Sequence, residues 1–132
     1  MKHVNLHFLP LVTLLTALVG GCSKSADSAA IPSATPPKPR EAASQLHQAF
    51  AAAPVEVRQS AQVASEALQT ANYEQAIQTL QRLRMRTGLT PEQGMAIHSS
   101  ERSLEAGLIS AMEAGDPKAK QAYELLKKSH RN

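Results

Sequence analysis

Apolar residues recur every three or four positions through residues 55–129, and they form separate stripes. Residues at this spacing share one face of an α-helix, so each stripe predicts one amphipathic helix with a buried face. The four stripes are Val57, Ala61, Ala64, Leu68 and Ala71; Tyr73, Ala76, Ile77, Leu80 and Leu83; Ile97, Leu104, Leu108, Ile109 and Met112; and Ala119, Ala122, Tyr123 and Leu126. No alternation of β-branched or aromatic residues with polar ones indicates a strand.

Proline, glycine and capping residues indicate the ends of the first helices. Pro54 suits the first turn of a helix, because its missing N–H needs no partner there. Asn72 can cap the next helix, and Gln75 is placed three positions later to close a capping box. Gly88 is a natural C-terminal stop. The expected helices in this part of the chain are Glu41–Ala52, Val55–Thr70 and Tyr73–Arg86.

Two more helices follow from the same chemistry. Thr90-Pro91-Glu92-Gln93 has a capping threonine, a proline in the first position and a glutamine three residues after the cap. That helix is expected to run to about Ala114 and to end at Gly115, and Asp116 then starts the last helix, Pro117–Ser129. The sequence therefore predicts an all-α domain, a small bundle of about four to five helices arranged as antiparallel hairpins. Many of its core positions are alanine, which leaves marginal stability or self-association as an expectation.

The segment before the helices has a different composition. Residues 23–40 read SKSADSAAIPSATPPKPR, in which Ile31 is the only large apolar side chain. Such a segment buries too little surface to offset the entropy of ordering it, so we expect a disordered Pro/Ala/Ser tether.

The first residues have the pattern of an export signal. Lys2 supplies a short positive region, and Phe8 to Val19 is an apolar stretch of twelve residues. As a helix this stretch spans roughly 18 Å, well short of the ~30 Å hydrocarbon core of a bilayer. A cleaved signal peptide is therefore favoured over a permanent transmembrane helix.

The end of this signal resembles the lipobox of bacterial lipoproteins, an apolar residue and two small residues before a cysteine. Val19-Gly20-Gly21-Cys22 fits that pattern, and Cys22 is the only cysteine of the chain. The resemblance implies removal of residues 1–21 as the signal peptide and attachment of a lipid carrying palmitate-like acyl chains to Cys22. Ser23 follows the cysteine where the family's inner-membrane signal has Asp. This implies an anchor in the outer membrane, facing the periplasm, with residues 22–40 as tether and 41–132 as helical domain.

Residues 55–88 resemble a single tetratricopeptide repeat. The resemblance rests on Ala64, Ala67, the run Ala71-Asn72-Tyr73-Glu74-Gln75-Ala76-Ile77, Leu80 and Leu83. Ala71 stands where that family usually has Gly, and Gly88 stands where Pro often closes the repeat. The resemblance implies one αα-hairpin. A solenoid of about three repeats does not fit into this chain.

Composition removes several function classes. The net charge of +3 and the 3% of aromatic residues, none of them Trp, argue against a nucleic-acid partner. His47, His98 and His130 are far apart, and His98 and Ser99 on a helix would point about 100° apart. We expect no catalytic residues, no metal site and no cofactor, and hence no enzyme.

Two basic clusters are the remaining candidate sites. Arg82, Arg84 and Arg86 lie at the end of the third expected helix, and Lys127, Lys128 and Arg131 at the end of the last. Stabilisation of helix C-termini by positive charge is sufficient to account for both. The first hypothesis is thus a lipid-anchored, non-enzymatic envelope protein that binds another protein or a copy of itself. The alternative is a binder of an envelope polymer or another anionic ligand through the Arg82–Arg86 patch.

Overall fold

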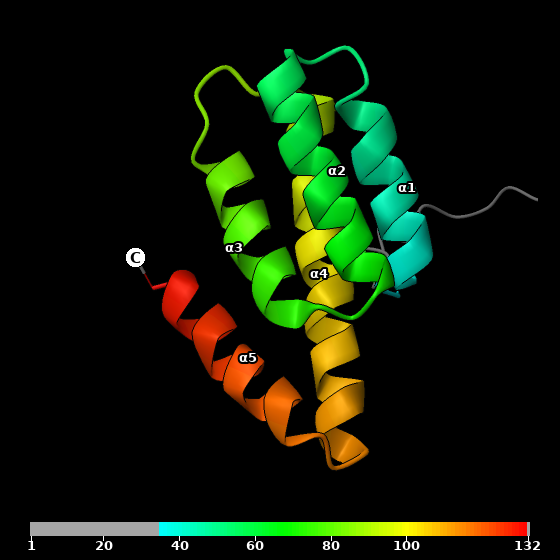
Figure 1. The fold of residues 1–132 in the computed structure, drawn as a ribbon, viewed down its shortest axis with the longest axis vertical. Coiled ribbons are helices and arrows are strands. Elements are labelled where there is room, and N and C mark those ends of the chain that lie inside the picture. The colour runs from blue at the N-terminus through cyan, green and yellow to red at the C-terminus, as the bar shows by residue number, and fades with distance from the viewer. Residues whose placement is uncertain (1–34, 132) are drawn as a thin grey trace, which may run out of the picture. The chain divides into compact units, whose positions relative to one another are not determined.

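The computed structural model describes residues 35–131, and within them every regular element is a helix. Five helices follow one another with short connections, as expected for an all-α domain (Figure 1). They are α1 (Pro39–Ala49), α2 (Val55–Gln69), α3 (Tyr73–Arg84), α4 (Pro91–Glu113) and α5 (Pro117–Ser129).

The first four helices form an antiparallel bundle (Figure 1). α1 packs on α2 and α4, and α3 packs on the same two helices from the other side. α2 and α3 thus form the αα-hairpin expected over residues 55–88. α5 packs chiefly on α3 and α4, and it crosses the bundle obliquely beside the second half of α4. α5 is therefore the peripheral helix of the fold.

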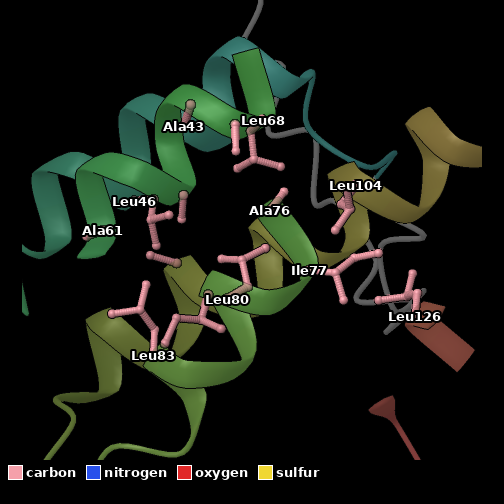
Figure 2. Close-up of a cluster of buried hydrophobic side chains, with 14 of the residues drawn as sticks. Ala43, Leu46, Ala61, Leu68, Ala76, Ile77, Leu80, Leu83, Leu104 and Leu126 are labelled. Carbon is pink, nitrogen blue, oxygen red and sulfur yellow. The ribbon is translucent and has the colours of Figure 1, made fainter. Parts of the chain in front are cut away.

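All five helices contribute to one hydrophobic core. Phe50 and Leu46 come from the end of α1, and Leu80, Leu83 and Leu108 from α3 and α4, all of them fully buried. Figure 2 shows the buried side chains converging, with alanines between the larger groups. Alanine lets helices approach closely but buries little area, so the leucines and Phe50 supply most of the hydrophobic stabilisation.

The caps that start α4 and α5 have the predicted geometry. Thr90 Oγ1 accepts a hydrogen bond from the backbone N–H of Gln93 at 3.2 Å, and Gln93 Oε1 accepts from the N–H of Thr90 at 3.1 Å. This reciprocal pair is the expected capping box. Asp116 Oδ1 accepts from the N–H of Lys118 at 2.9 Å, so it caps α5 as predicted. Short-range hydrogen bonding therefore fixes both helix starts.

The α1 and α3 boundaries differ from those expected. α1 begins at Pro39 instead of Glu41 and ends at Ala49, where the buried Phe50 turns the chain. α3 ends at Arg84, two residues early, and Gly88 lies in the connection beyond it, with φ +78°. The early end has a packing reason, because Leu89 in that connection is half-buried against the core.

Two residues of the predicted stripes lie outside the core. Ala71 is exposed and has a left-handed backbone with φ +54°, because it forms the turn between α2 and α3. Ile109 is 40% exposed. It lies in the second half of α4, which is covered on one side by α5 and the start of α3 and therefore buries a narrower face.

Candidate functional site

Cys22, the predicted lipidation site, lies outside the described residues, as do residues 23–34 of the predicted tether. Pro36 and Pro37, which the sequence assigned to that tether, are half-buried just before α1.

Within residues 35–131, no helix combines the length and the apolar character needed to cross a membrane.

The three arginines of the predicted basic patch have different surroundings. Arg82 donates to the backbone oxygen of Gln78 at 3.4 Å and to the hydroxyl of Thr79 at 3.2 Å, so it lies along its own helix. Arg84 Nη1 forms an ion pair with Glu101 Oε1 on α4 at 3.4 Å. Arg86 is exposed in the α3–α4 connection. The structure therefore does not point all three side chains at one spot.

Arg84 instead joins the two basic clusters that the sequence showed separately. Its Nη2 donates to the backbone oxygen of Ser129 at 3.4 Å, a contact across 45 positions of sequence. The end of α5 thereby lies beside the end of α3. Residues 82–86 and 127–131 contain six arginines and lysines and no acidic residue. We call these two segments together the basic rim.

Only part of the charge on the basic rim is neutralised by nearby acids. Glu101 pairs with Arg84, and Glu124 pairs with Lys127 at 3.1 Å. The Lys127 ammonium also lies 5.5 Å from the centre of the Tyr123 ring, within cation–π range. Four cations of the rim have no acidic partner among residues 35–131: Arg82, Arg86, Lys128 and Arg131. The rim thus carries a local excess of positive charge.

A shallow cleft of about 320 Å³ adjoins this rim. Its walls come from α3, α4 and the residue after α5, and they consist entirely of titratable side chains: Arg84, His98, Glu101, Arg102, Glu105 and His130. His98 is exposed, and the hydroxyl of the neighbouring Ser99 donates a hydrogen bond to Gln45 on α1 at 3.3 Å. The two side chains do not form a nucleophile–base pair. Among the described residues, no three His, Cys, Asp or Glu side chains come together as metal ligands.

A further groove, which was not predicted, lies elsewhere. It measures about 690 Å³ and runs between the α2–α3 turn and α5. Tyr73 and Leu125 are among the residues that line it, and Glu74 and Lys118 add one charge of each sign. No pattern in the sequence indicated it, because it forms only where α5 lies across a distant hairpin.

Comparison with protein-family models, with curated proteins and with solved structures finds no match to this chain.

Proposed function

We propose that this chain is a lipid-anchored protein of the cell envelope, whose helical domain binds a second protein or a second copy of itself and catalyses no reaction. One observation carries the anchor. The only cysteine of the chain stands at the end of Val19-Gly20-Gly21-Cys22, directly after a short apolar stretch. Two or more acyl chains at Cys22 would hold the protein firmly at a bilayer.

Exposed apolar side chains support a binding role. Val55 is 57% exposed and Met95 66%, although each is large enough to favour a buried place. Both lie at one end of the bundle, within two turns of the α1–α2 or α3–α4 connection. Exposed apolar side chains that lie at one end of a domain are typical of a site for a protein partner.

The anchor is tested by labelling cells with a radioactive fatty acid. Wild-type protein should carry the label and run at the size of a chain that starts at Cys22. Cys22→Ser should leave an unlabelled precursor. Wild-type protein that is cleaved at another residue and carries no label would refute the anchor.

The membrane is tested by fractionation of the envelope. Ser23 should send the lipidated wild-type protein to the outer membrane, and Ser23→Asp should retain it in the inner membrane. Identical fractionation of both proteins would refute the assignment to the outer membrane while leaving the lipid itself intact.

The binding role is tested on a chain that starts at Ser23. The described core consists only of residues between 42 and 126, so this chain keeps all of it. Light scattering gives its mass in solution, where a dimer supports self-association. A monomer that crosslinks in cells to one defined protein supports a different partner, and a monomer without such a crosslink contradicts the proposal.

A further inference from the structure

We propose that the basic rim is a second membrane contact, which binds the anionic surface of a phospholipid bilayer independently of a lipid at Cys22. The inference starts from the hydrogen bond between Arg84 and the backbone oxygen of Ser129. This contact links the last turn of α3 to the last turn of α5. The exposed cations Arg86, Lys128 and Arg131 stand within two residues of the two linked positions. The whole chain has a net charge of +3, and the six cations of the rim are almost half of its fourteen.

The cations that remain available point to an anionic ligand. Arg84 and Lys127 have acidic partners, whereas Arg86, Lys128 and Arg131 are exposed and make no ion pair within residues 35–131. A single surface salt bridge would neutralise only one of these cations, whereas the surface of a bilayer presents many phosphates at once. Clusters of arginine and lysine bind anionic lipid in this way, and the attraction weakens as salt rises.

Met85 favours a bilayer over a soluble polyanion. It stands between Arg84 and Arg86, directly after the last residue of α3, and it is 80% exposed, the largest value among the large apolar side chains described. An apolar side chain flanked by cations suits the interface of a bilayer, where the cations meet headgroups and the apolar group enters the acyl boundary. A soluble polymer of phosphates would contact the same arginines and gain nothing from Met85.

A lipid at Cys22 and the basic rim would act together. A bilayer anchor of one or a few acyl chains becomes stronger when a basic surface of the same chain also binds. The two attachments would hold the domain against the membrane on its α3–α5 side. The rim does not need the lipid to bind, so the two proposals fail independently.

The test uses the chain that starts at Ser23, which lacks both the signal peptide and Cys22. Its binding to phosphatidylcholine vesicles is measured by co-sedimentation, with and without phosphatidylglycerol, at low and high salt. We expect binding only to vesicles that contain phosphatidylglycerol, and release by salt. Absence of binding at low salt, or equal binding to neutral vesicles, would overturn the proposal.

Charge placement is tested with two matched double variants. Arg86→Gln/Arg131→Gln removes two cations from the rim, and Arg40→Gln/Lys120→Gln removes two exposed cations outside it. Each rim arginine should contribute about fivefold to vesicle binding, so the rim variant should bind at least tenfold more weakly. The control should stay within about twofold of the wild type. Equal losses of vesicle binding in both variants would show that binding depends only on the net charge of the chain. This result would overturn the assignment of the basic rim as the binding site.

Met85→Gln separates a bilayer from other anionic partners. It should weaken binding to phosphatidylglycerol vesicles and leave binding to soluble polyphosphate unchanged. Loss of the rim arginines could weaken binding to both vesicles and polyphosphate while Met85→Gln weakens neither. In that case the rim binds a soluble polyanion or an acidic protein, and the bilayer is the wrong partner. Circular dichroism of each variant checks that these exposed substitutions leave the helices intact.

Discussion

The ring of Tyr73 at the start of α3 lies against Gly107 of α4. A Cβ atom added to Gly107 would be 3.9 Å from Cε1 of that ring, which is ordinary van der Waals contact. Tyr73 is half-buried there, and it also lines the groove between the α2–α3 turn and α5. Gly107 thus lies at the contact between the α2–α3 hairpin and α4.

Gly107→Ala should stabilise the domain, because alanine fits at 3.9 Å from Tyr73 and glycine is a poor helix former. The expected gain is roughly 0.5–1 kcal/mol in the free energy of unfolding, measured by urea denaturation. Gly107→Leu should instead displace the ring and cost roughly 1–3 kcal/mol. A gain from leucine as large as that from alanine would show that the ring does not lie over this position.

Ala71→Gly should also stabilise the domain, for a different reason. α2 and α4 both end in a Schellman motif, with Asn72 N–H bonded to Ala67 O at 2.9 Å and Asp116 N–H bonded to Ala111 O at 3.0 Å. The left-handed residue is Gly115 (φ +88°) after α4 but Ala71 (φ +54°) after α2. We expect Ala71→Gly to gain about 0.5–1 kcal/mol and Gly115→Ala to lose about 1 kcal/mol. Thermal melts that shift in the same direction for both variants would contradict this account.

The ends of α4 and α5 could be predicted from the sequence because their chemistry is local. Thr90 and Gln93, like Asp116 and Lys118, are within three positions of each other, so their hydrogen bonds need no tertiary structure. The turn between α2 and α3 was also predicted, from the Asn72 cap, but the residue type alone does not indicate the left-handed conformation of Ala71. Alanine is a strong helix former, and only the meeting of α2 and α3 forces it into a left-handed conformation.

The candidate site could be predicted only in part. The sequence showed both basic clusters, but their meeting through Arg84 and Ser129 depends on how α5 crosses α3. Ala119 and Ala122 are buried on the face of α5 that packs on the bundle, and such small side chains do not indicate in the sequence which helix they pack against. The pairing of Arg84, rather than Arg82 or Arg86, with an acid of α4 depends on the same geometry.

Replacement of three buried serines by alanine should change the free energy of unfolding in opposite directions. Ser65 donates to Ala43 O at 3.0 Å and has a second acceptor at Ala61 O, whereas Ser100 and Ser103 on α4 are buried without a partner. Ser65→Ala should cost about 1 kcal/mol by removing a bond between α1 and α2. Ser100→Ala and Ser103→Ala should each gain up to about 1 kcal/mol, because an unsatisfied hydroxyl is removed and alanine favours the helix. Urea denaturation of the three variants measures these changes, and a loss at Ser100 or Ser103 equal to that at Ser65 would contradict the assignment.

Packing inside the α2–α3 hairpin is tested at two neighbouring positions of α3. Ala76 is fully buried and Gln78 is exposed. Ala76→Leu should overpack the interior and cost roughly 1–3 kcal/mol. Gln78→Leu should change stability by no more than about 0.5 kcal/mol. Equal melting temperatures for the two variants would mean that α3 is not packed in this orientation.

The peripheral position of α5 predicts that it opens before the bundle does. Leu126 is the only fully apolar side chain larger than alanine that α5 buries nearly completely, and it lies at the edge of the core (Figure 2). Leu126→Ala should therefore cost roughly 2–5 kcal/mol in the docking of α5. Amide exchange should then accelerate in α5 and hardly change in α2, because α5 packs chiefly on α3 and α4. Leu46→Ala, which removes an equally large side chain from α1 within the bundle, should accelerate exchange in all of the first four helices. The same exchange pattern in both variants would show that α5 folds as part of a single cooperative unit.

Selective opening of α5 would also separate its end from Arg84. Leu126→Ala should therefore weaken vesicle binding by the basic rim, although the substitution leaves the charge of the rim unchanged.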